Sequence, residues 1–374
     1  MGGHAPCLFR RLHGAGGAVG PKVVLLLTGL LLGMSQPAEA TVVRHVFRVD
    51  LPVSHLAARL PAADVQRAAG ILLDRITGDP DLAARGTVSA LIAESGQWVA
   101  EYGYKKADAQ GGGRTGTPSR LPFRLWIRFA HRAVERAVLG AHLPFWGDLR
   151  PRLLIWLDPG SSSGEILSAS SSSSLRRHLD RALIRLALPA FLPIMDLKER
   201  SAVAPPNLFP PAWPLLHQVS RPYHAEALWV GRLRGNAARG WMGSFAVQMG
   251  RFTLDWQSVH AHLHRWSVLQ SALDYLDSIL ASRYAVFASH QPVPLSIRIR
   301  GHLTLRQVSR IEHFIHHLPG VSQPRLLELA PQSLVLTLVS RIDRTHLERL
   351  MTLAGPGLFL KPEPGHRLVF ALQS

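Results

Sequence analysis

Cysteine is almost absent from this chain. Its single Cys7 lies within the first forty residues, so a chain that starts after residue 40 carries no thiol. Such a chain can form no disulfide, even in an oxidising compartment. Zinc sites built from thiolates, thiol nucleophiles and thiol redox chemistry are excluded by the same count. Cys7 also precedes the apolar run described next, so it does not fit a lipid-acceptor cysteine, which follows such a run.

A membrane-spanning apolar run is missing as well. The uncharged apolar run near the N-terminus covers residues 23–34, only twelve residues, whereas a helix needs about 20 to span a bilayer. Three basic residues precede this run, and Ala38-Glu39-Ala40 follows it with the small-x-small pattern that signal peptidase accepts. We therefore expect residues 1–40 to be a cleaved export signal, and the mature product to be a soluble periplasmic protein without a transmembrane span.

Acidic residues are few relative to basic ones. The chain has 42 Lys and Arg against 25 Asp and Glu, a formal charge of +17, and removing the three basic and one acidic residues of 1–40 lowers this to +15. The excess either attracts an anionic partner, such as lipid, an envelope polymer or an acidic protein, or reflects an arginine-rich composition spread over solvated surfaces. Nucleic acid is disfavoured, because the basic residues lack the aromatic interleaving that single-strand binding uses.

Hydrophobic periodicity divides the rest of the chain into three regions. Residues 41–148 are predicted to form a small α/β domain, and residues 149–291 a three-layer α/β domain with an antiparallel edge. Residues 292–374 show the order βαββαβ of a ferredoxin-like unit. The predicted fold class is therefore mixed, α/β and α+β, in a multi-domain chain.

The individual elements follow from alternation, amphipathic stripes and turn residues. In the first region we expect strands at 42–50 and 121–129, and helices at 64–76, 88–101 and 131–139. In the second we expect strands at 152–157, 191–195, 225–233, 241–249 and 252–256, and helices at 175–188, 215–223 and 264–281. In the third we expect strands at 295–300, 321–328, 333–339 and 368–372, and helices at 304–317 and 343–353. The Ser/Gly stretch 159–174 is expected to be a flexible loop, and the five prolines of 205–214 to preclude regular structure.

A series of short motifs resembles one protein family. The motifs are RITG at 75–78, YGY at 102–104, LPFWG at 143–147, RP at 150–151, PIMD at 193–196, the strand 225–233 and ASRYA at 281–285. In order and spacing they are similar to domain-of-unknown-function family 2066, a set of secreted bacterial proteins. The resemblance covers almost the whole chain after residue 40. It implies an exported protein and brings no catalytic residues or cofactor with it.

Two aspartates follow strands that are predicted to be buried. Asp158 follows the strand 152–157, and Asp196 follows the strand 191–195. Ligands of open α/β sheets gather at the carboxyl ends of strands, so a shared crevice would make this pair an acid/base couple or a cation site. The favoured alternative is that Asp158 starts a turn and Asp196 caps the segment that follows it.

Three alternating histidines form a second candidate. On a strand, His260, His262 and His264 would share one face, and imidazole is a common ligand of zinc and copper. Their spacing of roughly 6.5 to 7 Å is too wide for all three to reach one ion. A solvated cluster at the start of a helix is therefore the favoured reading, and no metal is expected.

Four further side chains are candidates for interaction with a partner. Trp146 and Trp213 lie beside prolines or glycine, where exposed aromatics sometimes dock partners, although packing at a domain junction is favoured for them. Arg298 and Arg300 alternate with apolar residues along the strand 295–300. They are therefore predicted to give the C-terminal sheet a basic face suited to an acidic partner.

No catalytic constellation is recognisable. The chain contains no G-x-S-x-G, S-x-x-K or H-E-x-x-H. The leading hypothesis is a non-enzymatic periplasmic protein that acts as an interaction scaffold or in envelope assembly, with protein partners. The first alternative is a binding module for anionic envelope polymer or lipid. The second is a hydrolase or metal enzyme that uses Asp158 and Asp196 or the histidine cluster, and no cofactor is expected.

The C-terminal unit is predicted to fold alone. A fragment that starts near His290 has complete βαββαβ order, and a unit of about 80 residues buries enough surface for marginal stability. We expect it to unfold cooperatively in denaturant. A fragment that is disordered by circular dichroism and proton NMR would show that the boundary or the fold is wrong.

Overall fold

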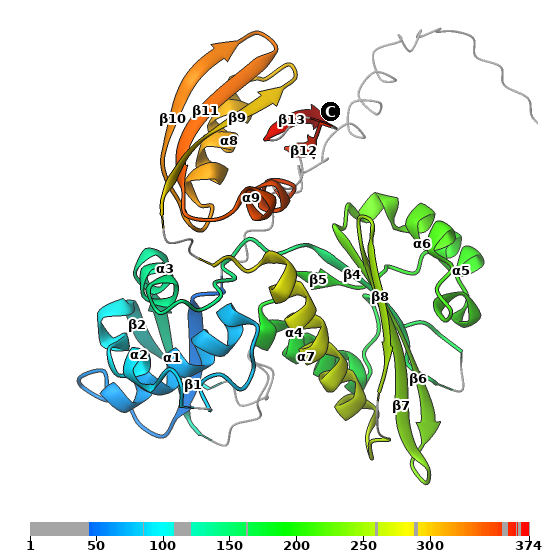
Figure 1. Cartoon of the computed structure of the whole chain (residues 1–374). Coiled ribbons are helices and arrows are strands. Elements are labelled where there is room, and N and C mark those ends of the chain that lie inside the picture. The colour runs from blue at the N-terminus through cyan, green and yellow to red at the C-terminus, as the bar shows by residue number, and fades with distance from the viewer. Residues whose placement is uncertain are drawn as a thin grey trace, which may run out of the picture. The chain divides into compact units, whose positions relative to one another are not determined.

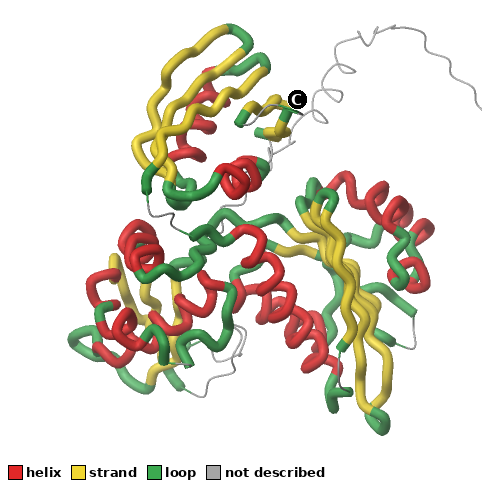
Figure 2. The backbone as a smooth tube through the Cα atoms, in the orientation of Figure 1, coloured by secondary structure: helices red, strands yellow, loops and turns green. Residues whose placement is uncertain are grey.

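The computed structural model describes residues 45–373 except 85, 108–120, 162–163, 259–260, 288–290, 354–357, 364 and 366–367. The predicted export signal therefore lies outside the described residues. The described part belongs to one compact unit and contains three β-sheets, one in each predicted region. Figure 1 names the helices and strands, and Figure 2 separates them from the loops. Within this part of the chain, every helix is too short or too polar to cross a membrane.

The N-terminal sheet is antiparallel, with strand order β1-β3-β2. Its elements are β1 (Arg48–Val53), α1 (Ala62–Thr77), α2 (Ser89–Ala93), β2 (Val99–Lys106), β3 (Phe123–Phe129) and α3 (His131–Gly140). The expected helix 88–101 is wrong beyond Ala93, because a 3-10 turn follows and the chain then enters β2. There Tyr102 and Tyr104 pair with strand β3, as suits aromatic side chains on a pleated surface.

The middle sheet has strand order β5-β4-β6-β7-β8. Its strands are β4 (Leu153–Asp158), β5 (Ala190–Phe191), β6 (Ala227–Asn236), β7 (Gly240–Met249) and β8 (Phe252–Gln257). Strand β4 runs parallel to β5 and β6, whereas β6, β7 and β8 form an antiparallel meander. The antiparallel edge is therefore confirmed, although β5 is shorter than the expected strand 191–195.

Helices cover both faces of this sheet (Figure 1). They are α4 (Ser174–Leu186) and α7 (Arg265–Tyr284) on one face, and α5 (Leu197–Ala202) and α6 (Trp213–Ser220) on the other. All six residues of β4 are buried. Leu153 and Ile155 belong to one hydrophobic core, whereas Leu154 and Trp156 belong to a second one. Alternate side chains of one strand thus fill two cores, which confirms the three-layer arrangement.

The proline-rich stretch 205–214 is more regular than expected. It contains a 3-10 turn, Pro205–Leu208, and the first two residues of α6. Prolines occupy the first turn in both elements, where the missing N–H has no intrahelical acceptor and the fixed φ suits a helix. The expectation of no regular structure is wrong for this reason.

The C-terminal sheet has strand order β10-β11-β9-β13-β12. Its elements are β9 (Val293–Arg300), α8 (Leu305–His316), β10 (Val321–Ala330), β11 (Ser333–Ser340), α9 (Arg344–Met351), β12 (Phe359–Pro362) and β13 (Val369–Gln373). The order of the four predicted strands is that of a ferredoxin-like unit. The additional strand β12 reverses the chain before β13, so β13 runs parallel to β9.

Gly78 is a position where the fold requires glycine. It ends α1 with φ +69°, and a Cβ atom there would lie 2.0 Å from the Ala281 Cβ of α7. Gly250 also has a positive φ, +58°, but a Cβ atom there would meet no atom within 4 Å. We expect Gly250→Ala to lower the free energy of unfolding by roughly 1–2 kcal/mol, because alanine disfavours the left-handed backbone.

Gly78→Ala is expected to lower the free energy of unfolding by the same backbone term as Gly250→Ala. It is expected to lower it by about 1–3 kcal/mol more, because the added methyl group overpacks the contact between α1 and α7. Urea unfolding of the two variants measures this difference. Equal losses in the two variants would show that α1 does not pack against α7 as described.

Candidate functional site

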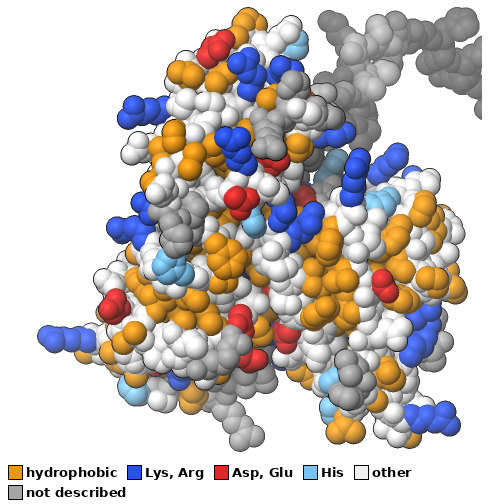
Figure 3. Space-filling view, in the orientation of Figure 1, with side chains coloured by type: hydrophobic (Ala, Val, Ile, Leu, Met, Phe, Trp, Pro, Cys, Tyr) orange, Lys and Arg blue, Asp and Glu red, His pale blue; other side chains and the backbone are white. Residues whose placement is uncertain are grey.

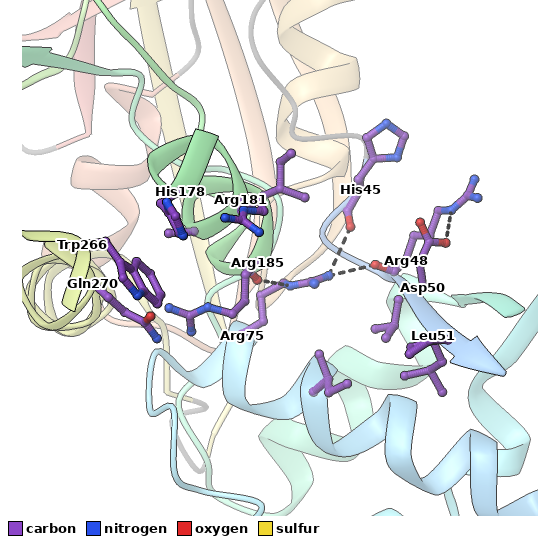
Figure 4. Close-up of a pocket in the computed structure, with 15 residues that line it drawn as sticks. His45, Arg48, Asp50, Leu51, Arg75, His178, Arg181, Arg185, Trp266 and Gln270 are labelled. Atoms are coloured by element: carbon purple, nitrogen blue, oxygen red, sulfur yellow. Dashed lines mark hydrogen bonds and ion pairs between the residues drawn. The ribbon is translucent and has the colours of Figure 1, made fainter. Parts of the chain in front are cut away.

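A half-open cavity of about 540 Å³ lies where β1 and α1 face α4 and α7. Figure 4 shows its labelled side chains converging from these four elements. The cavity has the size of a small-ligand pocket. Its walls combine arginines, aromatic rings and apolar side chains; they are His45, Arg48, Val49, Asp50, Leu51, Pro52, Ile71, Arg75, His178, Arg181, Ala182, Ile184, Arg185, Trp266 and Gln270.

Arg75, in the last turn of α1, forms the base of this pocket. Its Nη1 donates to the backbone carbonyls of Val46 and Arg48, each at 2.8 Å, and its Nε donates to the carbonyl of Arg185 at 3.0 Å. Figure 4 shows the bonds to Arg48 and Arg185 as dashed lines, together with a third bond from Nη1 to the His45 carbonyl at 3.3 Å. Burial lowers the pKa of Arg75 to about 10, so the guanidinium stays charged at neutral pH. Arg75 thereby holds the segment before β1 against the end of α4.

Arg150 lies behind Arg75 and joins a second set of carbonyls. It donates to the carbonyls of Leu186 at 2.6 Å, Arg75 at 2.9 Å and Gly147 at 3.0 Å. Its guanidinium also lies 4.0 Å from the centroid of the Trp146 ring. Burial lowers the pKa of Arg150 to about 10. The two arginines therefore form one network, because Arg150 bonds the carbonyl of Arg75 itself.

A buried carboxylate accompanies the two arginines. Asp277 of α7 lies 3.9 Å from Nη1 of Arg150, too far for a hydrogen bond. Burial raises the pKa of Asp277 to about 7, against the opposing attraction of Arg150. Desolvation therefore outweighs the ion pair, and a substantial fraction of Asp277 is protonated at neutral pH.

The pocket carries an excess of positive charge. Four arginines and one aspartate line it. Arg48 bonds Asp50 at 3.2 Å and also lies over the Trp126 ring at 4.6 Å. Arg185 is paired with Asp274, which is outside the pocket lining. Because the arginines outnumber the carboxylates around them, the pocket favours an anionic ligand.

The remaining wall is aromatic and apolar. The Trp266 ring stacks on His178, with centroids 4.8 Å apart, and His178 is held by a 2.8 Å contact from its Nδ1 to the Ser174 carbonyl. At the rim, Ile71 and Ile184 are 37% and 39% exposed, high values for large apolar side chains. The pocket therefore offers contacts for an apolar group beside its arginines.

A second cavity, of about 810 Å³, lies beside the serine-rich loop that follows β4. Two arginines line it, but both use N–H groups on backbone carbonyls. Arg200 donates to Met195 at 2.6 Å, and Arg265 donates to Pro159 at 3.2 Å. Their charges hold the loop segments in place, so this cavity is the weaker candidate.

The structure does not bring the two predicted aspartates together in one contact. Asp158 is buried and forms ion pairs with Arg234 at 3.0 Å and Arg232 at 3.6 Å. Its other oxygen accepts from the Gly160 N–H at 2.9 Å, as in a turn. Asp196 is exposed and caps α5 in a capping box with Glu199. Both side chains thus have local structural partners of the kind that the alternative interpretation predicted.

The histidine cluster is only partly described. His260 lies outside the described residues. His262 pairs through its backbone with Trp241, and His264 is the residue immediately before α7. The described part of the chain contains no group of three side chains placed to hold a metal ion.

The predicted interaction residues have different surroundings. Trp146 is buried, 1% exposed, and packs against Arg150; the alternative in which it is exposed to a partner is therefore wrong, and its burial agrees with the favoured interpretation of packing at a junction. Trp213 is half-buried against the core below α6. Arg298 is exposed on the outer face of β9, and Arg300 forms an ion pair of 2.9 Å with Glu363. The alternation of basic and apolar faces along β9 is confirmed.

The arginines that build the pocket are not among the residues predicted from the sequence. Arg181 and Arg185 are one helical turn apart on α4, a spacing that places them on one face. This signal was present in the sequence. Arg75 offered a weaker signal, an arginine inside the apolar stripe of α1.

Comparison with known proteins gives one match. A family model described as a domain of unknown function (DUF8605) matches residues 40–147. The resemblance to family 2066 is therefore wrong, because the matching model is a different one and covers only the N-terminal region. No curated protein and no solved structure matches the chain.

The raised pKa of Asp277 predicts a specific pH dependence of stability. The folded state holds the Asp277 proton up to a pH of about 7, whereas an unfolded aspartate loses it near pH 4. The wild type therefore loses stability from this group as pH rises from 4 to 7, and Asp277→Asn does not. We therefore expect the free energy of unfolding of Asp277→Asn, relative to that of wild type, to rise by up to about 1.4 kcal/mol per pH unit across this range.

Urea unfolding at several pH values measures this difference. The exposed Asp255 of β8 provides a matched control, since Asp255→Asn makes the same change at the surface. An advantage of Asp277→Asn that is constant from pH 4 to 7 would contradict the assignment.

Proposed function

We propose that this protein is an exported, non-enzymatic interaction protein of the bacterial envelope. In this proposal its pocket between β1, α1, α4 and α7 receives an acidic group and an adjacent apolar side chain from a protein partner. The observation that carries the proposal is the excess of arginines in the pocket next to exposed isoleucines. Export rests on the expected signal at 1–40.

Arginine geometry supports a carboxylate as the anionic group. Arg181 and Arg185 project from one face of α4 into the pocket (Figure 4). Guanidinium groups bind carboxylates through paired, charge-assisted hydrogen bonds. Gln270 of α7 adds an amide that can donate or accept beside them. An acidic side chain or a C-terminal carboxylate fits this set.

The shape of the apolar wall supports a protein partner over a lipid. Ile71 and Ile184 lie at the exposed rim, where a short side chain reaches them. An acyl chain is better served by a deep apolar cavity. The free edge of β1 also favours recognition through side chains over pairing with a partner strand. The Arg48 carbonyl already accepts a hydrogen bond from Arg75, and Pro52 has no N–H to donate. These two residues restrict the addition of a partner strand at this edge.

The chemistry of the lining supports binding rather than catalysis. Asp50 is the one carboxylate among the described lining residues, and it is paired with Arg48. His178 is stacked on Trp266 and bonded to a backbone carbonyl. A nucleophile activated by a neighbouring base requires a different arrangement.

Reversal of one charge in the pocket tests the proposal. We expect Arg181→Glu to weaken binding of a short peptide of alternating leucine and glutamate by about tenfold or more, because it replaces attraction by repulsion. Arg177→Glu is the matched control: Arg177 lies one turn earlier on α4, is exposed and does not line the pocket. Isothermal titration calorimetry measures both affinities, with Arg177→Glu expected to stay within about threefold of wild type.

Equal losses in both variants would indicate unspecific attraction by the basic surface and would contradict the proposal. Vesicles that contain anionic phospholipid provide a further comparison. If Arg181→Glu abolishes vesicle binding and leaves peptide binding unchanged, the ligand is a lipid and the peptide proposal fails.

A further inference from the structure

The second half of strand β10, from Leu326 onward, leaves an apolar edge of the C-terminal sheet uncovered. The first half of the strand, residues 321–325, lines a cavity together with α3. Strand β10 pairs with β11 on one side and is the outer strand of the sheet (Figure 1). Three of its leucines are exposed: Leu326 by 43%, Leu327 by 67% and Leu329 by 49%. Hydrophobic side chains reach the surface of this unit among arginines (Figure 3). Long edge strands are usually protected by charge or by a covering element, so three neighbouring leucines indicate a surface that is covered by a partner.

A β-bulge gives this edge an unusual pattern of charges. Leu326 pairs with Leu336 and Glu328 pairs with Val335, so Leu327 is the extra residue of the bulge. Arg325, opposite Thr337, and Glu328 therefore lie on the same face of the sheet. In a regular strand, residues three apart would lie on opposite faces.

Both charges are available to a partner. Arg325 and Glu328 are exposed, and neither forms an ion pair with another described residue. The segment 325–328 has the sequence Arg-Leu-Leu-Glu. When this segment is placed antiparallel to a copy of itself, each arginine faces a glutamate and the leucines face leucines.

We propose that β10 is the interface of a homodimer, in which two copies of the chain meet antiparallel about a two-fold axis through the bulge. Arg325 of one copy then faces the partner's Glu328, and symmetry provides this pair twice. Leu326 and Leu327 of both copies pack in the centre and leave water, and Leu329 lies just outside the charge pairs. The bulge interrupts the regular backbone ladder, so the central contacts are made by side chains.

This surface is independent of the pocket. No residue of β10 lines the cavity of β1, α1, α4 and α7. A dimer presents two such pockets, so a partner with two binding segments gains avidity. Failure of one proposal leaves the other untouched.

Charge reversal and its repair test the interface in sedimentation equilibrium of the purified protein. Wild type is expected to dimerise with increasing concentration. Arg325→Glu and Glu328→Arg each create two like-charge pairs, and each is expected to weaken the dimer by about tenfold or more. The double variant Arg325→Glu/Glu328→Arg restores opposite charges and is expected to return to within about threefold of wild type.

Two further variants separate the interface from general effects. Leu327→Asp is expected to abolish the dimer, because it places a charge at the apolar centre. Arg298→Glu, on the same outer sheet face but on β9, is expected to leave the dimer unchanged. Circular dichroism verifies that each variant is folded. A wild type that stays monomeric at all concentrations, or a double variant no better than the single ones, would overturn the proposal.

Discussion

Two buried arginines are the constraint on which the pocket and its surroundings depend. Arg75 and Arg150 each bind several backbone carbonyls, and Arg150 binds the carbonyl of Arg75. Hydrogen bonds to a charged group contribute roughly 1.5–3 kcal/mol each. Loss of either guanidinium would also leave buried carbonyls without donors, which costs more than the bonds alone. The network is therefore stable only when it is complete.

The same network determines the geometry of the pocket. Arg75 joins the carbonyls of Val46 and Arg48 to the carbonyl of Arg185, which is 110 residues away in sequence. The segment before β1 and the last turn of α4 are thereby held against one another. Arg185 lines the pocket with its side chain while its backbone is fixed from below. The pocket is thus supported by the backbone bonds of Arg75 at its base and of Arg150 behind it.

Periodicity was sufficient to predict most of the regular elements. Strand β4 and the helices α4 and α7 follow from an apolar run and from amphipathic stripes, which depend only on local sequence. Strand β2 was missed because the sequence around 88–101 also fits a helix, and its pairing with β3 decides between the two. Strand β12 is four residues long and pairs only with β13, so its local signal is weak. Pairing with a neighbouring strand overrode the local preference in both places.

The pocket could not be predicted because arginine is ambiguous in a sequence. Arg181 on the pocket wall and Arg177 on the outer surface lie one turn apart on the same helix, yet only one lines the cavity. Burial of Arg75 and Arg150 depends on carbonyls from other elements, which no local pattern records. Charge composition therefore left open an anionic partner or a general excess of surface arginine, and it could not point to this pocket.

The lack of cysteine makes this use of arginine physically reasonable. Disulfides can join distant segments of a chain, but this chain has no cysteine after residue 7. Arg75 bonds carbonyls 27 to 110 residues away from it in sequence, and Arg150 bonds carbonyls up to 75 residues away. Each guanidinium reaches several carbonyls at once, whereas a disulfide joins two residues. The desolvation that this requires also raises the pKa of Asp277, because a carboxylate beside the arginines must share their dry environment. The cationic network and the partly protonated Asp277 therefore have one cause: distant segments of this chain are connected by buried guanidinium groups and not by disulfides.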